Sequence, residues 1–297
     1  MPDFFKMRDQ MEKGAGFIAA LDQSGGSTPK ALALYGVDAN DYDGEDAMFA
    51  EIQRMRERII RAPDFTNTKV IGAILFEKTL NERIDDQSVP EHLWEKRGVV
   101  PFLKIDKGLE DEANGVQLLK PIPGLADTLA AAKALGVFGT KERSVINSAN
   151  QDGVAAIVDN QFAVAHEVIA AGMVPIIEPE VNIHSETKAE AETMLADALM
   201  ARVEGLSEGQ DVMLKLTLPE QAGLYDALAD HPRVVRVVAL SGGYSTADAS
   251  ARLAQNHKMI ASFSRALTQG LQRDMSDAEF DASLGANINT IYDASIS

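Results

Sequence analysis

The sequence contains no cysteine and no run of 18 uncharged apolar residues. Without cysteine, the chain can form neither a disulfide framework nor a thiolate metal site. Without a long apolar run it has no candidate transmembrane helix, and its first residues lack the basic and apolar segments of a signal peptide. We therefore expect a soluble, unexported protein of the cytoplasm.

Motifs for metals and nucleotides are also missing. The histidines are scattered without the paired spacing of metal ligands, at His92, His166, His184, His231 and His257. The chain has neither a dinucleotide-binding glycine fingerprint nor a Walker A motif. We expect no metal and no cofactor.

Positive charge is scarce, with 28 Lys and Arg against 45 Asp and Glu and a formal net charge of −17. This balance argues against nucleic acid or an anionic membrane as a partner, because both bind basic surfaces. A phosphorylated substrate would need a local positive site within a repelling overall field. The positions of the basic residues are therefore more informative than their number.

Short aliphatic runs, apolar on both faces, alternate with helical patterns along the 297 residues, as expected of parallel strands covered by helices. The runs are 16–22, 70–76, 99–106, 137–141, 174–180, 212–217, 234–241 and 259–265. The helical patterns are 3–13, 45–61, 125–135, 153–171, 186–203, 219–229, 246–255 and 277–291. The alternation predicts one (β/α)8 TIM barrel over residues 1–297, with a doubly wound open sheet as the alternative. Segment 81–97 is irregular and charged, and its pattern assigns no element.

Polar residues follow nearly every predicted strand, at the end where barrel active sites are built. They are Asp22, Glu77, Lys104, Asp106, Lys141, Arg143, Glu178, Glu180, Lys215, Ser241, Ser262 and Arg265. We expect these side chains to converge on one site.

Lys215 lies within the apolar run 212–217, where strand alternation places it on one face with Met213 and Thr217. A buried ammonium must be paired or lose its charge, and a neutral amine is a nucleophile. Its own strand favours the alternative that the lysine stem packs while the head reaches water. The surrounding strand ends favour the nucleophile instead.

Glu178 and Glu180 share a strand face because they are two residues apart. Like charges held together raise the pKa of at least one of them, which makes a proton carrier; the alternative is that both neutralise neighbouring lysines. Lys141 could lie across the barrel from Lys215, where a second cation would lower the pKa of the first amine.

Two glycine-containing loops are candidate anion sites. Residues 241–245, Ser-Gly-Gly-Tyr-Ser, precede a helix and follow the seventh strand, beside the usual phosphate site of such barrels. Residues 22–30 place Ser27 or Thr28 as a helix N-cap with Pro29 in the first turn. Two anion sites suggest a substrate with two phosphates.

Together these stretches resemble the class I, Schiff-base-forming fructose-1,6-bisphosphate aldolases, and most closely their shorter bacterial branch. The resemblance extends in family order through almost the whole chain, in Ala20-Leu21-Asp22-Gln23-Ser24-Gly25-Gly26-Ser27, Ile74-Leu75-Phe76-Glu77-Lys78-Thr79-Leu80, Lys104-Ile105-Asp106-Lys107-Gly108, Pro175-Ile176-Ile177-Glu178-Pro179-Glu180, Leu214-Lys215, Leu240-Ser241-Gly242-Gly243 and Ser262-Phe263-Ser264-Arg265-Ala266-Leu267. It implies a barrel that reversibly cleaves fructose 1,6-bisphosphate to dihydroxyacetone phosphate and glyceraldehyde 3-phosphate.

The resemblance also implies catalytic roles. Lys215 matches the lysine that forms the iminium, Glu178 the acid/base for carbinolamine formation and dehydration, and Glu180 a carboxylate that tunes the site. Asp22 matches the carboxylate near the C4 hydroxyl, and Lys141 matches the cation beside the bond that breaks.

The phosphate ligands follow in the same way. Ser241, Gly242, Gly243 and Arg265 match the ketone-side site, while Ser24, Ser27 and Lys104 lie toward the other phosphate. From their strand ends we add Arg143 and Ser262 as candidate ligands. A Schiff-base aldolase for another ketose, such as tagatose or sedoheptulose bisphosphate, and a non-catalytic binding barrel are the alternatives. Small-molecule sugar phosphates are the expected partners, and a homo-oligomer stays open.

The chain departs from animal members in two places. Glu142 follows Lys141 where they have an aromatic residue, and the chain stops soon after its last predicted helix, without their long tail ending in a tyrosine. Tyr292 is the candidate substitute for that tyrosine.

Overall fold

A computed structural model describes residues 2–297, and its centre is a ring of parallel strands. In spatial order the strands are β1 (Phe17–Leu21), β2 (Val70–Leu75), β5 (Val100–Lys104), β7 (Gly139–Ile146), β8 (Val174–Val181), β9 (Val212–Thr217), β10 (Val234–Leu240) and β11 (Met259–Ala261). Each pairs in parallel with the next along this order. β11 also lies beside β1, but within residues 2–297 no ladder joins them. The predicted TIM barrel is therefore confirmed as a nearly closed one, and the open sheet is excluded.

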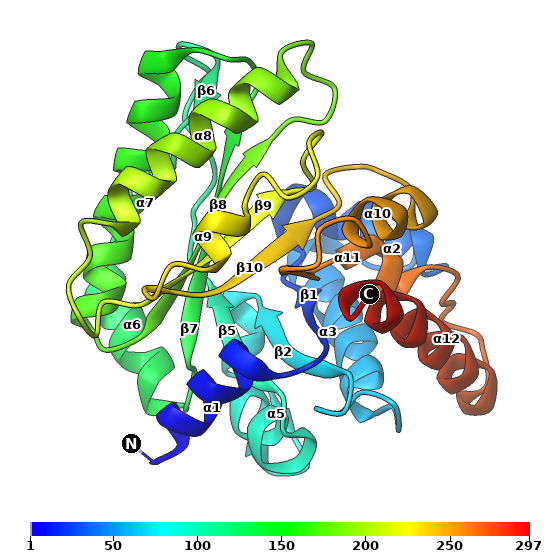
Figure 1. Ribbon diagram of the computed structural model, residues 1–297. Helices are drawn as coiled ribbons and strands as arrows, with labels where there is room; N and C mark the ends of the chain where they lie inside the picture. The colour runs from blue at the N-terminus through cyan, green and yellow to red at the C-terminus, as the bar shows by residue number, and fades with distance from the viewer. Residues whose placement is uncertain (1) are drawn as a thin grey trace.

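Helices surround this ring (Figure 1). They are α1 (Pro2–Lys13), α2 (Thr28–Leu34), α3 (Gly44–Arg61), α4 (Glu77–Leu80), α5 (Val89–Arg97), α6 (Leu125–Ala134), α7 (Gln151–Ala170), α8 (Lys188–Val203), α9 (Asp226–Ala229), α10 (Thr246–Leu253), α11 (Ser264–Thr268) and α12 (Asp277–Ser295). Local sequence explains their ends: Asn150 caps α7 by accepting from the Gly153 N–H at 2.9 Å, and Ser276 with Glu279 forms a capping box on α12. No helix among these residues is both long and apolar enough to cross a membrane.

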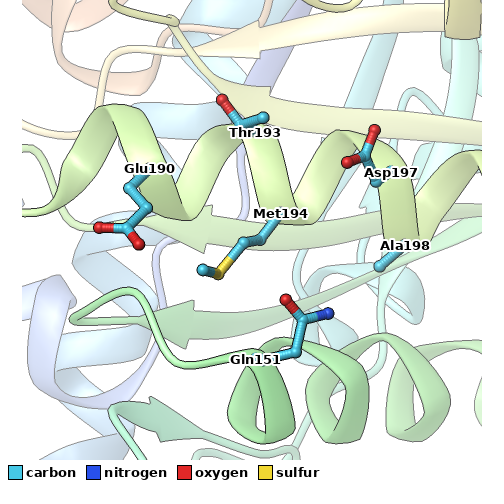
Figure 2. A pocket seen from close by; sticks show the side chains of 6 residues that line it. All are labelled: Gln151, Glu190, Thr193, Met194, Asp197 and Ala198. Carbon is cyan, nitrogen blue, oxygen red and sulfur yellow. The ribbon is translucent and has the colours of Figure 1, made fainter.

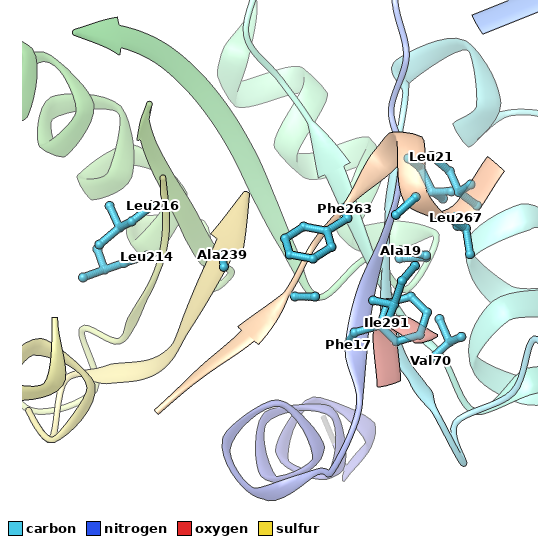
Figure 3. Packing of buried hydrophobic residues seen from close by; sticks show 14 of the residues in the cluster. Phe17, Ala19, Leu21, Val70, Leu214, Leu216, Ala239, Phe263, Leu267 and Ile291 are labelled. Atoms are coloured by element: carbon cyan, nitrogen blue, oxygen red, sulfur yellow. The ribbon is translucent and has the colours of Figure 1, made fainter. Parts of the chain in front are cut away.

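Strand alternation separates two apolar cores. Outward residues such as Phe17, Ala19 and Leu21 of β1 pack against the helix layer together with Leu267 and Ile291 (Figure 3). Inward residues form a second cluster inside the barrel that includes Met213, Ile176 and Phe102. Both faces of each strand are thus buried, which explains why the strands appear in the sequence as continuous apolar runs.

α1 closes the end of the barrel where the strands begin (Figure 1). Its Met7 and Met11 join the inner cluster, and the rings of Phe4 and Phe138 lie 5.0 Å apart. Phe138 also meets Phe102 edge to face at 5.5 Å. This apolar plug leaves the opposite, C-terminal end of the strands for a site.

Three predicted elements differ from the observed ones. β7 continues to Ile146 because the short strand β6 (Val116–Gln117) pairs with its end, so Lys141 lies inside the strand rather than at its last residue. The predicted helix 219–229 is reduced to α9, since Gly223 has a φ of +77° that a helix does not accept. The eighth strand ends at Ala261, and Arg265 belongs to α11.

Segment 81–97, which the sequence pattern left unassigned, contains a hairpin and a helix. β3 (Arg83–Ile84) and β4 (Gln87–Ser88) pair antiparallel around Asp85 and Asp86, both with positive φ, and α5 follows. Two-residue hairpin turns favour such a backbone. The segment was hard to interpret because its strands are only two residues long.

Candidate active site

A cavity of 880 Å³ opens at the C-terminal ends of the barrel strands. Its lining includes nearly every candidate site residue: Asp22, Ser24, Ser27, Lys104, Lys141, Arg143, Glu178, Glu180, Lys215, Ser241, Gly242, Ser262 and Arg265. Gly243, the remaining candidate, lies next to this lining but is not part of it. Segments from distant parts of the chain are therefore brought together at one end of the barrel, as predicted.

Lys215 is positioned by the inner face of β9. Met213 belongs to the inner apolar cluster, and Lys215, two residues later on the same face of β9, reaches the cavity. Lys215 is only 4% exposed, so the interpretation of a lysine that extends to water is wrong. Ile176 and Glu178 repeat this arrangement on β8.

Four charged side chains, of which Lys215, Glu178 and Lys141 are buried and Asp22 is nearly so, form an alternating chain at the centre of the site. The Lys215 Nζ lies 3.0 Å from the Glu178 Oε1, and the Glu178 Oε2 lies 2.8 Å from the Lys141 Nζ. The Lys141 Nζ in turn lies 2.7 Å from the Asp22 Oδ2. Two ammonium groups thus alternate with two carboxylates, which makes their burial tolerable.

The pKa values follow from this alternation. Burial alone would raise the pKa of Glu178 and of Asp22, but the attraction of Lys141 and Lys215 outweighs it and lowers both. Burial would lower the pKa of Lys141, but Asp22 and Glu178 raise it. The prediction of a raised pKa is therefore wrong for Glu178, because this carboxylate lies between two lysines while Glu180 pairs with the Arg143 Nε. Glu178 also separates Lys141 from Lys215.

A second set of ion pairs surrounds these four residues. The Lys104 Nζ lies 2.6 Å from the Asp106 Oδ1. The Asp106 Oδ2 accepts a hydrogen bond from the main-chain N–H of Arg143 at 3.2 Å. Arg143 then pairs with Glu180. These contacts join the ends of β5, β7 and β8 and hold Lys104 and Arg143 at the cavity wall.

The loop after β10 leaves two consecutive main-chain N–H groups without an acceptor in the described part of the chain. Gly242 and Gly243 have φ values of +57° and +128°, and in the described part of the chain their N–H groups donate no hydrogen bond. A Cβ at Gly242 would lie 2.8 Å from the Ile183 Cγ2, so a larger residue would not fit. The Ser262 hydroxyl is buried in the same wall without a partner among residues 2–297, and Arg265 lies beside it.

The loop after β1 has a different geometry. Ser27 stands at the N-cap of α2 and Pro29 in its first turn, as predicted, but the Ser27 hydroxyl makes no capping hydrogen bond. It accepts from the Ser24 N–H at 3.0 Å and donates to the Ser24 carbonyl at 3.0 Å. The cavity wall as a whole has seven basic against five acidic side chains, so a locally positive site forms in an acidic protein.

Gln23, which lines the cavity, and Arg56, which lies behind it, were assigned no role from the sequence. The buried Arg56 of α3 donates to the Gln23 carbonyl at 2.5 Å and to the Thr79 hydroxyl at 2.9 Å. The Gln23 amide donates to the Ser264 hydroxyl at 2.8 Å and so links the loops after β1 and β11. No motif marks Arg56, because arginine in a charged amphipathic helix ordinarily faces water.

Glu142 and Tyr292 are both absent from the lining of the cavity. Glu142 is fully buried on the outer face of β7, where burial and then Asp106 raise its pKa well above the usual range. Tyr292 lies with its ring 6.0 Å from the Lys69 Nζ, just before β2 and so at the closed end of the barrel. The expectation that Tyr292 substitutes for the C-terminal tyrosine is therefore not supported by its position.

Another hollow, of 490 Å³, lies on the outer helix layer between α7 and α8 (Figure 2). It is lined by Gln151, Glu190, Thr193, Met194, Asp197 and Ala198. None of its residues comes from a strand end. In the described range, no group of three or more metal-ligating side chains occurs in this hollow or elsewhere.

The fold and the cavity define a TIM-barrel protein whose site centres on a buried lysine paired with a carboxylate. A family model described as class I fructose-bisphosphate aldolase matches residues 6–222. The chain is 55% identical over 287 residues to "Fructose-bisphosphate aldolase class 1" from Synechocystis, which covers 97% of the chain and 96% of that relative. It is 51% identical to the protein of the same name from Porphyromonas gingivalis, with 97% of each covered. The chain belongs to the class I fructose-bisphosphate aldolase family.

A solved structure supports the fold independently. The aldolase of Plasmodium falciparum superposes with a TM-score of 0.78 over 99% of this chain and 94% of that one. Its sequence identity is 19%, so the likeness concerns the arrangement of strands and helices.

Proposed function

We propose that the protein cleaves fructose 1,6-bisphosphate reversibly to dihydroxyacetone phosphate and glyceraldehyde 3-phosphate through an iminium on Lys215. The observation that carries this proposal is the Lys215–Glu178–Lys141–Asp22 chain, with contacts of 3.0, 2.8 and 2.7 Å. Identity above 50% to curated class 1 aldolases favours the same substrate. Because charged sugar phosphates cross membranes poorly, we place the reaction in the cytoplasm.

Iminium formation needs a proton carrier beside the lysine, and Glu178 has that position. It takes a proton from the Lys215 ammonium, and the free amine attacks the C2 carbonyl of the ketose to form a carbinolamine. Glu178 then returns the proton to the C2 hydroxyl, which leaves as water. The product is a protonated imine, which accepts the electrons of a breaking C–C bond far better than a ketone does.

Cleavage needs a base at the C4 hydroxyl, a role we assign to Asp22. The carboxylate takes the hydroxyl proton, the C3–C4 bond breaks, and its electron pair moves into the iminium to give an enamine. Lys141 keeps Asp22 ionised in the free enzyme and lies beside the developing charge. Protonation of the enamine at C3 and hydrolysis of the new iminium release dihydroxyacetone phosphate.

The two phosphates would occupy two separate parts of the cavity. Gly242 and Gly243 offer free N–H groups near Ser241, Ser262 and Arg265, which suits the ketone-side phosphate. Ser24, Ser27, Lys104 and Arg143 also line the cavity and are the candidates for the other phosphate. This division matches a bisphosphate better than a monophosphate.

Borohydride reduction tests the proposal directly. In the presence of dihydroxyacetone phosphate, reduction should add the mass of the reduced adduct at Lys215, as mapped by proteolysis and mass spectrometry. Reduction without the ketose is the control. An adduct at another lysine, or none, contradicts the mechanism. Side-by-side kinetics with tagatose and sedoheptulose bisphosphates then define the ketose preference.

A further inference from the structure

A network of charges lies directly behind the phosphate loop after β10. The hydroxyl of Tyr244, the residue after Gly243, donates to the Glu220 Oε1 at 3.1 Å. The Arg252 guanidinium lies 4.4 Å from the centre of the Tyr244 ring and 3.4 Å from the Glu220 Oε2. One tyrosine thus connects the glycine loop to an acidic residue in the loop after β9.

Glu220 is itself held firmly. The buried Lys188 Nζ lies 3.1 Å from the Glu220 Oε1, pairs with the buried Glu192, and donates to the Leu218 carbonyl at 2.9 Å. Glu192 also accepts from the Glu220 N–H at 2.9 Å. The acceptor of Tyr244 is therefore fixed to the turn that follows β9, the strand of Lys215.

The glycine loop needs such an anchor because two consecutive glycines have wide backbone freedom. Its other restraints are local: the Tyr244 N–H donates to the Ser241 carbonyl at 2.9 Å, and Ser245 caps α10. Among the hydrogen bonds and ion pairs of residues 241–245 in the described part of the chain, the one that reaches the β9 turn is made by the Tyr244 hydroxyl. Loss of that hydrogen bond would leave the loop 241–245 folded but free to shift relative to β9.

We propose that Tyr244 is a positioning residue, whose hydroxyl holds the Gly242 and Gly243 N–H groups in place for the ketone-side phosphate. The inference rests on the proposed function and adds a residue outside the cavity lining. Burial and the hydrogen bond to Glu220 raise the pKa of Tyr244 to about 12, so the hydroxyl keeps its proton at working pH. Tyr244 acts through the loop and contacts no reacting atom.

The test is Tyr244→Phe, which removes one oxygen and keeps the ring against Arg252. The KM for fructose 1,6-bisphosphate should rise about five- to tenfold with kcat within about twofold, the size expected for losing one ordinary, partly exposed hydrogen bond. Inorganic phosphate, as a competitive inhibitor, should weaken by the same factor. Fructose 6-phosphate, which lacks the ketone-side phosphate, should show no change in kcat/KM. Tyr42→Phe, at a half-buried tyrosine outside this network, is the matched control and should behave as wild type.

Several results would overturn the inference. An unchanged KM, or an equal loss with fructose 6-phosphate, shows that the hydroxyl does not act through phosphate binding. Glu220→Gln keeps an acceptor for Tyr244 but removes the charge, and it should give a smaller rise in KM than Tyr244→Phe. A wild-type protein that cleaves no ketose refutes the proposed function instead. Calorimetric titration of wild type and Tyr244→Phe with inorganic phosphate still tests the anchored loop in that case.

Discussion

The two ends of the barrel are built from the same strands and differ completely in chemistry. At the closed end, Met11 of α1 joins Phe102 and Phe138 in one apolar cluster, and all three side chains are buried. At the open end, two residues further along the same faces, Lys104 and Lys215 enter a charged cavity. The apolar floor excludes water from below, so the buried charges at the open end must satisfy one another.

The largest effect should come from Lys215→Met at the open end. The change keeps a long side chain but removes the proposed nucleophile, so turnover should fall by about a thousandfold or more while the protein stays folded. A coupled cleavage assay measures the rate, and a thermal melt measures stability. Lys258→Met, at an exposed lysine paired with Asp230, is the control and should retain full activity. Retained cleavage by Lys215→Met would contradict the mechanism.

Phe102→Ala, at the closed end, should lower the stability of the protein and leave its activity nearly unchanged. Removing a fully buried ring that contacts Phe138 should lower the free energy of unfolding by about 3–5 kcal/mol. Well below the melting temperature, kcat should stay within about threefold of wild type. Urea titration and the same cleavage assay check both values. A large loss of kcat without a loss of stability would mean that the two ends are not separable.

Acid should act on the open end more than on the closed one. The pKa values of Asp22 and Glu178 are lowered in the folded protein, so the unfolded chain takes up protons first as the pH falls. Their stabilisation is fully present at pH 7 and should be lost below about pH 4, at a cost of about 1–2 kcal/mol. Urea midpoints from pH 7 to pH 3 should fall less steeply in Asp22→Asn than in wild type. Phe102→Ala should shift the whole curve downward and leave its slope unchanged.

The smallest effect should come from Tyr292→Phe. Tyr292 lies near Lys69 at the closed end, so removing its hydroxyl should leave kcat and KM within about twofold of wild type. Exchange of the C3 proton of dihydroxyacetone phosphate with solvent, followed by NMR, gives a direct measurement. A slower exchange in the variant would show that the Tyr292 hydroxyl influences the cavity, and so that the closed and open ends of the barrel are coupled.

Sequence patterns predicted the ring of strand ends because alternation and strand polarity are local properties. Lys215, Glu178 and Asp22 could be assigned to one cavity once eight parallel strands were expected. The pKa of Glu178 could not be predicted, because it depends on which cation lies on each side across neighbouring strands. The role of Arg56 could not be predicted either, because its partners are a main-chain carbonyl and the hydroxyl of Thr79.

The barrel is most easily deformed at the gap between β1 and β11, where no strand ladder is described. Where a strand partner would stand, the Ala261 N–H donates to the Ser295 hydroxyl of α12 at 3.0 Å, and Gln23 spans the loops to Ser264 at 2.8 Å. Side-chain contacts of this kind break one at a time, whereas a ladder resists opening along its whole length. Asp22 and Arg265 stand on opposite sides of this gap. Small changes in its width would alter the distance between Asp22 and Arg265 without disturbing the Lys215 strand.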